Sequence, residues 1–319
     1  MVLSVIIPVY NVEPYVGKVL ESVFVTTAST EDFEVIVVND GSEDGSMDVV
    51  RQFAGRPNLT VIEQENRGLG AARMKGLSVA SGEYVWFVDS DDWLVEGGVG
   101  KVLNLLAGRP GAEVLRFPLR WIREDGTEDE RWEHVWEHPL EKELVVDGRT
   151  LVRDLHMEVG GSQRFVILRS LFSDPRLYFP EGVLFEDVYF GAVLITVVGR
   201  FHVMPESIYC YRIRGGSIMR TLKVDSCYDM VSVHKMVMRF KEEAVDPSDW
   251  PWFDKYYFRR LEFAYARMEH CLSSPKFRLF TLTKGGYVWK RWKEVHPEAS
   301  WKTDLKQLTR FLAPTRLPL

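Results

Sequence analysis

The sequence predicts an α/β fold with a mostly parallel sheet and helices on both of its faces, followed by a mainly helical C-terminal region. Apolar runs rich in β-branched residues alternate with helical patterns through about the first hundred residues, which is typical of parallel sheets in α/β proteins. Polar loops, several of them with glycine, follow these runs. After Val224 the apolar spacing is mostly helical through Thr309.

The amino-terminal elements can be assigned in chain order. Short apolar runs predict strands at residues 3–9, 33–38, 59–63 and 83–88. Apolar residues spaced along one helix face predict helices at residues 15–25, 46–53, 70–80 and 99–106. Because parallel strands need crossovers of this length, we expect a doubly covered sheet whose ligands bind beyond the carboxyl ends of its strands.

The pattern of the next part of the chain is less regular. Residues 120–143 are charged and rich in Trp and His, which predicts an irregular or hairpin excursion. The spacing then predicts helices at residues 150–156 and 165–171, a longer helix within 182–198 and a strand at 208–213.

Length and composition predict a soluble protein with one large domain and a smaller appendage, since the chain has 319 residues of which 46% are hydrophobic. Cys210, Cys227 and Cys271 are far apart and show no metal spacing, so we expect core thiols in a reducing compartment. The first residues lack a basic segment and a cleavage site, and no apolar stretch approaches the roughly 20 residues that span a bilayer. We therefore expect a cytoplasmic protein.

The net charge of −6 is unevenly distributed. Residues 251–319 hold 14 Lys and Arg against 6 Asp and Glu, which leaves −14 for residues 1–250. Nucleic-acid binding is not expected of so acidic a region, although the basic tail alone could associate nonspecifically. The tail also carries many aromatic residues, among them Trp252, Phe253, Tyr256 and Tyr257. They fit either a peripheral membrane contact through 251–319 or a helical cap with an aromatic core.

A short acidic cluster is the most informative feature of the sequence. Asp89, Ser90, Asp91 and Asp92 directly follow an apolar run that is predicted to be a buried strand. Carboxylates crowded at the edge of a sheet repel one another unless a cation or hydrogen-bond donors offset their charge. Oxygen ligands of this kind suit Mg²⁺ or Mn²⁺, which in turn suit a diphosphate. The alternative is a solvated turn with Asp as a helix cap.

Two further strands are also followed by polar loops. Asp40, in Asn39-Asp40-Gly41-Ser42, can accept an N–H from a nucleobase, and Gly41 lets backbone amides approach a ligand closely. A plain tight turn explains the same residues. Residues 66–76 contain Gly68-Leu69-Gly70-Ala71-Ala72-Arg73 but lack the third glycine of a dinucleotide loop. They fit a helix packed close to a sheet, with Arg73 aimed at a base or a phosphate.

Two later segments carry charged residues with two interpretations each. Glu186 and Asp187 precede an apolar helical run, so they are either part of a site or acids that stabilise a helix N-terminus through its dipole. Arg212 and Arg214 lie where a strand passes into a glycine-containing loop. Their guanidinium groups fit either a loop that closes over a diphosphate or a solvated edge strand.

In order, these motifs resemble those of family 2 glycosyltransferases with the GT-A fold. The resemblance runs through residues 4–11, 37–42, 66–76, 81–84 and 87–93, and continues at 185–190 and 209–218. It covers roughly residues 1–220, with a nucleotide-sugar half at about 1–100 and an acceptor half at about 101–220. Residues 221–319 form a separate helical, basic and aromatic region.

The resemblance implies a role for each matching residue. Pro8, Tyr10, Asn11, Asp40 and Arg73 would line the nucleoside pocket, with Gly41, Ser90, Arg212 and Arg214 as further donor-binding residues. Asp89 and Asp91 would be the Asp-X-Asp pair. Asp91 would be the direct ligand of Mn²⁺ or Mg²⁺, and Asp89 would face the ribose or a metal-bound water. Asp187 would be the general base, supported by Glu186. Met74 stands where relatives commonly carry Asn, so a polar contact from that position is not expected.

The implied activity is inverting transfer of a sugar from a nucleotide-diphosphate donor, with UDP-sugar favoured, to a glycan or lipid-linked acceptor. The implied role is in cell-envelope or extracellular polysaccharide assembly, in the cytoplasm or at the inner face of the membrane. A sugar nucleotidyltransferase would need a long glycine-rich basic loop after the first strand, where Tyr10, Asn11, Val12 and Glu13 stand instead. A non-catalytic nucleotide-sugar-binding relative is the other alternative.

Overall fold

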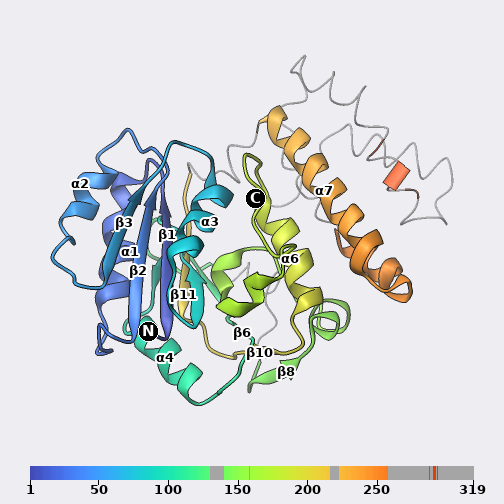
Figure 1. Ribbon diagram of the computed structural model, residues 1–319, viewed down its shortest axis with the longest axis horizontal. Coiled ribbons are helices and arrows are strands. Elements are labelled where there is room, and N and C mark those ends of the chain that lie inside the picture. The colour runs from blue at the N-terminus through green and yellow to red at the C-terminus, as the bar shows by residue number, and fades with distance from the viewer. Residues whose placement is uncertain are drawn as a thin grey trace. The chain divides into compact units, whose positions relative to one another are not determined.

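The computed structural model describes residues 1–129, 140–157, 159–215 and 223–257, together with residues 287, 290, 291 and 293. The chain divides into two compact units, Met1–Arg214 and Gly215–Leu319, and Figure 1 labels many of their helices and strands. The first unit holds both sheets and all of the predicted site residues.

An eight-stranded sheet forms the centre of the first unit. Its spatial order is β3 (Leu59–Glu63), β2 (Phe33–Asn39), β1 (Leu3–Val9), β4 (Tyr84–Phe87), β9 (Phe165–Leu168), β6 (Val114–Arg116), β10 (Phe201–Val203) and β8 (Leu144–Val146). Strands β3, β2, β1 and β4 are parallel. Strand β9 runs antiparallel between β4 and β6, and β8 is antiparallel to β10. The sheet is therefore mostly parallel, as predicted.

The register brings three strand ends to one edge of this sheet. Strand β1 pairs with β2 from Leu3↔Phe33 to Val9↔Asn39, and with β4 from Leu3↔Tyr84 to Ile6↔Phe87. Because the three strands are parallel and in step, the loops that follow them emerge side by side. Those loops are the ones predicted to bind the donor.

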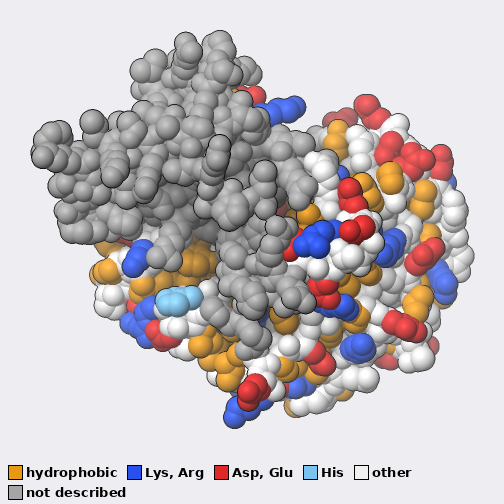
Figure 2. All heavy atoms as spheres, turned by 180° about the vertical axis from the view of Figure 1, so that it is seen from behind, with side chains coloured by type: hydrophobic (Ala, Val, Ile, Leu, Met, Phe, Trp, Pro, Cys, Tyr) orange, Lys and Arg blue, Asp and Glu red, His pale blue; other side chains and the backbone are white. Residues whose placement is uncertain are grey.

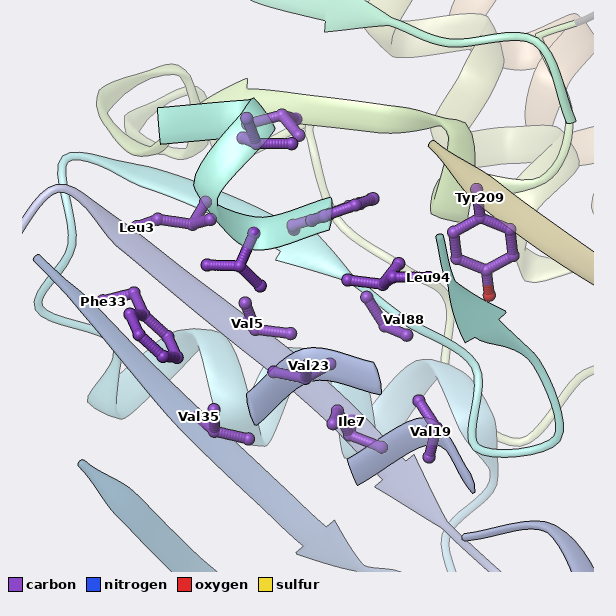
Figure 3. Packing of buried hydrophobic residues seen from close by; sticks show 14 of the residues in the cluster. Leu3, Val5, Ile7, Val19, Val23, Phe33, Val35, Val88, Leu94 and Tyr209 are labelled. Atoms are coloured by element: carbon purple, nitrogen blue, oxygen red, sulfur yellow. The ribbon is translucent and has the colours of Figure 1, made fainter. Parts of the chain in front are cut away.

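The two faces of β1 pack against different helices, because successive side chains of a strand point to opposite sides. Leu3, Val5 and Ile7 lie in the core with buried residues of α1 (Glu13–Phe24) and α4 (Gly98–Ala107), as Figure 3 shows for α1. Ile6 points to the other face, toward α3 (Leu69–Val79). A Cβ added at Gly76 of α3 would lie 2.4 Å from Ile6 Cγ2, so glycine is required for this close approach.

Helix α1 illustrates how the sequence forms these elements. Val16, Val19, Leu20 and Val23 are buried at helical spacing, and a proline stands in the first turn, where its missing N–H costs little. Burial of each such side chain contributes roughly 1.5–3 kcal/mol. Figure 3 shows Val19 and Val23 directed at the strands, with Tyr209 at one end of the same cluster.

A second, three-stranded sheet holds the loop residues near the carboxyl end of β4. Its order is β5 (Trp93–Leu94), β11 (Tyr209–Ile213) and β7 (Leu119–Arg123), with β11 antiparallel to β5 and parallel to β7. The pairing Cys210↔Trp93 brings residues that are far apart in sequence next to the acidic loop. The predicted strand at 208–213 is thus confirmed, and its partners explain how Arg212 and Arg214 reach the site.

Most other predicted elements are also present. The helices predicted at 15–25, 46–53, 70–80 and 99–106 correspond to α1, α2 (Ser46–Arg51), α3 and α4, and the helix within 182–198 is α6 (Glu186–Val197). Residues Thr150–Asp154 form a short π-helix. The excursion at 120–143 includes β7 and a turn closed by the antiparallel bridge Ile122↔Glu128, and its residues 130–139 lie outside the described residues.

The helix predicted at residues 165–171 is wrong. Phe165–Leu168 is strand β9, and Arg169–Ser173 is a 3₁₀ turn. Phe165, Val166 and Ile167 are fully buried because β9 sits inside the sheet with a strand on each side. An apolar run of four residues has the same appearance in a buried helix and in a buried strand, so only its tertiary partners decide.

The described part of the second unit includes α7 (Val224–Ala244) and the 3₁₀ turn Pro247–Asp249. Phe253 and Tyr257 are buried, so these two aromatic side chains are core residues. Cys210 and Cys227 are buried, as predicted for core cysteines, whereas Cys271 and the aromatic residues Phe258, Trp289, Trp292 and Trp301 lie outside the described residues. None of the helices that the structure describes has the length and apolar character needed to cross a membrane.

Candidate active site

The acidic cluster forms the loop between β4 and β5. Its start is fixed by the sheet, since the Val88 N–H donates to the Ile6 carbonyl at 2.9 Å. Asp89 and Asp91 keep 21% and 24% of their side chains exposed, whereas Ser90 and Asp92 are buried. The two partly exposed carboxylates are therefore the ones that a ligand can reach.

Arg73 joins this loop to the start of α6. Its Nη2 donates to Asp89 Oδ1 at 2.8 Å and its Nη1 to Glu186 Oε1 at 2.5 Å, with only 3% of the side chain exposed. Burial opposes the charge, but the carboxylates of Asp89 and Glu186 raise the pKa of Arg73 above its usual value. The guanidinium also lies 5.1 Å from the centre of the Phe179 ring. The structure thus places Arg73 between two acids, and its contact with a base or a phosphate stays a prediction.

Arg212 and Arg214 lie on the other side of the acidic loop. Arg214 Nε donates to Asp91 Oδ2 at 2.7 Å, and Arg212 Nε donates to the Asp91 carbonyl at 2.7 Å. Both guanidinium groups stack on the Tyr15 ring, at 5.1 and 4.9 Å for Arg212 and Arg214, and Arg212 also lies 4.6 Å from the Trp93 ring. These contacts place two cations beside the proposed metal ligand.

Asp92 and Tyr209 hold the acidic loop in place through buried hydrogen bonds, a role that was not predicted from the sequence. The Tyr209 hydroxyl donates to Asp92 Oδ2 at 2.7 Å and accepts the Asp89 N–H at 3.1 Å. The Arg212 N–H donates to Asp92 Oδ1 at 2.7 Å. Burial, followed by the charges of Asp91 and Asp89, raises the pKa of Asp92 well above its usual range. Asp92 and Tyr209 are 117 residues apart in the sequence, so no local pattern pairs them. The alternating strand predicted at 208–213 indicates only that alternate side chains, such as that of Tyr209, point into the protein.

Glu186 and Asp187 form the first turn of α6, directly after Phe185. Phe185 has a φ of 66°, in the left-handed region that non-glycine residues rarely adopt. Glu186 is 6% exposed, and its burial, despite Arg73, raises its pKa to about 7. Asp187 is half-buried and accepts the Gly161 N–H at Oδ2, 2.7 Å away. Asp187 also lies close enough for its charge to help raise the pKa of Asp89.

Asp187 is the better placed of the two acids for proton transfer. Glu186 is occupied by Arg73, whereas Asp187 makes no second hydrogen bond within the described part of the chain, which leaves its Oδ1 available. The geometry therefore favours Asp187 as a base and Glu186 as the acid that positions Arg73.

The predicted nucleoside residues form a second group at the ends of β1 and β2. Asp40 is 3% exposed. Its Oδ1 accepts from the Arg67 N–H and from Gln64 Nε2, and its Oδ2 accepts from the Gly68 N–H. Since a carboxylate offers about four acceptor positions, one on Oδ2 remains. Asp40 thus holds residues 64–68, and its contact with a nucleobase stays a prediction.

The loops after β1 and β2 are held to each other by Asn11. Its N–H donates to Ser42 Oγ at 3.2 Å, and its Oδ1 accepts the Glu43 N–H at 2.9 Å. Asn11 and Gly41 both have positive φ, 50° and 76°. Tyr10 is 48% exposed and Pro8 is buried in β1. Of this group, Tyr10 and Asn11 present the most accessible side chains.

The donor set at the acidic loop fits a divalent cation that also binds a diphosphate. Asp89 and Asp91 supply carboxylate oxygens, and the charge of Asp91 adds to burial in raising the pKa of Asp89, a repulsion that a cation would offset. Among the residues described, no group of three or more His, Cys, Asp or Glu side chains is arranged to hold a metal ion. A pair of carboxylates is nevertheless compatible with Mg²⁺ or Mn²⁺, since proteins commonly hold Mg²⁺ through one or two carboxylates.

The chain is similar in sequence to known glycosyltransferases. Residues 4–159 match the model of a family described as Glycosyl transferase family 2. Glycosyltransferase GlyA of Streptococcus pneumoniae is 33% identical over 231 residues, which cover 68% of this chain and 31% of that protein. Poly(ribitol-phosphate) beta-N-acetylglucosaminyltransferase TarS of Staphylococcus aureus is 27% identical over 66% of this chain and 35% of its own length. The chain therefore spans about a third of the length of these two curated relatives.

Two solved structures share the fold. Residues 1–349 of S. aureus TarS in complex with UDP-GlcNAc match with a TM-score of 0.62 at 19% identity, over 92% of this chain and 91% of that chain. Mannosyltransferase PcManGT from Pyrobaculum calidifontis, in complex with GDP-Man and Mn²⁺, matches with a TM-score of 0.57 at 18% identity, over 98% and 87%. At these identities the likeness establishes the shared GT-A fold.

Proposed function

Since this chain belongs to glycosyl transferase family 2, we propose that it transfers a sugar, with inversion, from a UDP-sugar to an acceptor hydroxyl. The observation that carries the proposal is the bridge through Arg73, which links Asp89 of the donor loop to Glu186 beside Asp187. The bridge joins an acidic loop suited to a metal–diphosphate to a carboxylate suited to proton transfer.

Asp187 acts as the general base in this proposal. Its Oδ1 takes the proton from the acceptor hydroxyl while that oxygen attacks the anomeric carbon from the side opposite the diphosphate. The Gly161 N–H bond at Oδ2 fixes the carboxylate. General-base action of this kind accelerates a reaction roughly 10²–10⁴-fold. Glu186 and Arg73 position the base, since both are buried and paired with each other.

The leaving diphosphate would lie between the acidic loop and the two arginines. Asp91, with Asp89 beside it, would hold a divalent cation, and that cation when bound would offset negative charge on the diphosphate. Arg212 and Arg214 already lie within hydrogen-bond distance of Asp91. They can donate to phosphate oxygens in the planar, two-pronged manner that suits guanidinium groups.

UDP is the nucleotide we favour. TarS was solved with UDP-GlcNAc and PcManGT with GDP-Man and Mn²⁺, and TarS is similar to this chain in sequence as well as in fold, with the higher TM-score of the two. The remaining acceptor position of Asp40 suits the single imide N–H of uracil. Tyr10 and Asn11, the accessible residues of the same edge, would contact the nucleoside.

The acceptor we propose is a hydroxyl of a cell-envelope glycan or of a lipid-linked saccharide. The name of TarS supports this class, since it describes sugar transfer to poly(ribitol-phosphate). Nucleotide sugars would reach the enzyme in the cytoplasm, and a lipid-linked acceptor would place it at the inner face of the membrane. Contact of residues 251–319 with that membrane belongs to the same proposal.

The test is release of UDP from UDP-GlcNAc and UDP-glucose in the presence of Mn²⁺, with water or added acceptors, by wild type and by Asp187→Asn. We expect wild-type release and its loss in the variant, with UDP binding retained. Binding of UDP without any release by the wild type, across a panel of sugars and acceptors, would instead indicate a non-catalytic nucleotide-sugar-binding relative.

A further inference from the structure

The segment that leads into Glu186 and Asp187 lies against the start of α3. At its start, Gly70 of α3 approaches so closely that an added Cβ would lie 2.3 Å from the Pro180 carbonyl oxygen. At its far end, Arg73 donates to Glu186. Any displacement of α3 relative to this segment would therefore disturb the two acids.

A bidentate ion pair joins the other end of the same two segments. Arg67 Nε and Nη2 donate to Glu181 Oε1 and Oε2, both at 2.7 Å. Arg67 is itself fixed, because its backbone N–H donates to Asp40 Oδ1 at 2.8 Å. The chain of contacts thus runs from the end of β2, through Arg67, to a residue just upstream of the acids.

The pair is too exposed to matter much for global stability. Arg67 and Glu181 keep 59% and 49% of their side chains accessible, and ion pairs between such exposed side chains contribute little to stability. A two-pronged guanidinium–carboxylate contact nevertheless restricts the relative orientation of the segments that carry it. Geometry and exposure together indicate a positioning role.

The segment between Glu181 and Glu186 needs such external support. Gly182 and Phe185 both adopt left-handed backbone conformations, with φ of 70° and 66°. For Phe185, a residue with a Cβ, this backbone conformation is unfavourable and persists only where its surroundings impose it. The Arg67–Glu181 pair provides one such restraint at the entry to the turn, and Arg73 provides another at its exit.

We propose that Arg67 and Glu181 are a positioning pair, which fixes the turn before α6 and thereby the carboxylate of Asp187 relative to the donor loop. The effect of this pair on turnover rests on the proposed function, whereas its effect on the conformation of the turn does not. Arg67 contacts Glu181 and Asp40, and Glu181 contacts Arg67, so their effect on the reaction is indirect.

The experiment compares Arg67→Gln, Glu181→Gln and the exchanged pair Arg67→Glu/Glu181→Arg with the wild type. Asp48→Asn is the control, since it breaks a more exposed ion pair, with Arg51, that lies inside helix α2 and far from residues 181–188 in sequence. Four quantities are measured: UDP release from UDP-GlcNAc with Mn²⁺, UDP affinity by calorimetry, amide hydrogen exchange across residues 181–188, and Tm.

We expect each single variant to lower turnover about 10- to 100-fold, because small misplacements of a reacting group have effects of this size. UDP affinity and Tm should stay near wild type, exchange across 181–188 should accelerate, and the exchanged pair should recover most of both losses. The Asp48→Asn control should match the wild type in all four.

Unchanged turnover and unchanged exchange at 181–188 in both single variants would overturn the inference. Acceleration of exchange over the whole first unit, with a lower Tm, would also overturn it, because the pair would then be a general stabilising contact. A wild type that neither binds nor cleaves the donor would instead refute the proposed function, and the exchange data would still decide whether the pair fixes the turn.

Discussion

Arg214 donates from Nε to Asp91 Oδ2 at 2.7 Å, so the carboxylate proposed to bind a metal is already paired with a cation. Arg214 also stacks on Tyr15, and 18% of its side chain is exposed. A divalent cation arriving without nucleotide has to compete with this guanidinium. With a diphosphate present, Arg214 has phosphate oxygens to bind instead.

The first prediction follows from this competition. Arg214→Gln should bind Mn²⁺ alone about fivefold more tightly than the wild type, because a partly exposed ion pair of about 1 kcal/mol no longer opposes the metal. Calorimetry with MnCl₂ in the absence of nucleotide measures the change. Arg214→Lys, which keeps the charge, is the control and should resemble the wild type. Equal affinity of all three proteins would contradict the competition.

Asp187→Asn should retain UDP binding and lose UDP release roughly 10²–10⁴-fold, because the variant keeps an acceptor for the Gly161 N–H but has no basic oxygen. Glu186→Gln should behave differently. It keeps Asp187 but weakens the charged contact with Arg73, so a smaller loss of turnover is expected. Initial rates with saturating UDP-GlcNAc distinguish the two. An Asp187→Asn variant as active as the wild type would remove this residue from the mechanism.

Tyr209→Phe should lower the free energy of unfolding by about 1–3 kcal/mol, since it leaves Asp92 Oδ2 and the Asp89 N–H without their shared partner. Urea unfolding followed by fluorescence measures it. The matched control is Tyr211→Phe in the same strand, because the Tyr211 hydroxyl makes no hydrogen bond within the described part of the chain. If the two variants lose equal stability, the hydroxyl of Tyr209 has no special role.

Glu143 gives a prediction about pH that is independent of the site. Hydrogen bonds from Arg109, and then the contact with His202, hold the pKa of Glu143 at about 2, below its usual value of 4.5. Because the folded-state pKa is depressed, this carboxylate stabilises the fold fully above about pH 4.5, and the contribution is lost as the pH falls toward 2.

Glu143→Gln should therefore be about 1 kcal/mol less stable than the wild type at pH 7, and the difference should shrink between pH 5 and pH 3. Urea unfolding at pH 7, 5, 4 and 3 tests this, with Asp48→Asn as an exposed control. A difference that stays constant over this range would show that packing, and not charge, accounts for the effect of the substitution.

Much of the first unit could be predicted from the sequence because its elements are local. The apolar spacing of α1 and the β-branched runs of β1 and β2 determine helix and strand without help from distant residues. The parallel order then brings the loops after β1, β2 and β4 to one edge. The location of the site followed from these two facts.

The features that could not be predicted from the sequence depend on residues that are distant along the chain. Strand β9 was predicted as a helix because four apolar residues carry no decisive period, and β4 and β6 decide its conformation. The pairing of Asp92 with Tyr209, and the position of Arg73 between Asp89 and Glu186, join residues from separate elements. Local patterns contain no information about such contacts.

The surface of the described part shows why charge alone identified no site. On the face drawn in Figure 2, acidic and basic side chains lie interspersed with hydrophobic ones, with several acidic groups gathered at the upper right. The residues at the candidate site differ because they are partly or fully buried, as for Asp92 and Arg73.

The central claim is a UDP-sugar site whose metal is held by Asp91, and one calorimetric titration tests it most directly. Wild type and Asp91→Ala are titrated with UDP, GDP, dTDP and CMP, each with and without Mn²⁺. We predict that the wild type binds UDP in preference to the others, and only with Mn²⁺, and that Asp91→Ala loses this metal-dependent binding while remaining folded. Metal-independent binding, equal binding by both proteins, or no binding of any nucleotide by folded wild type would contradict the claim.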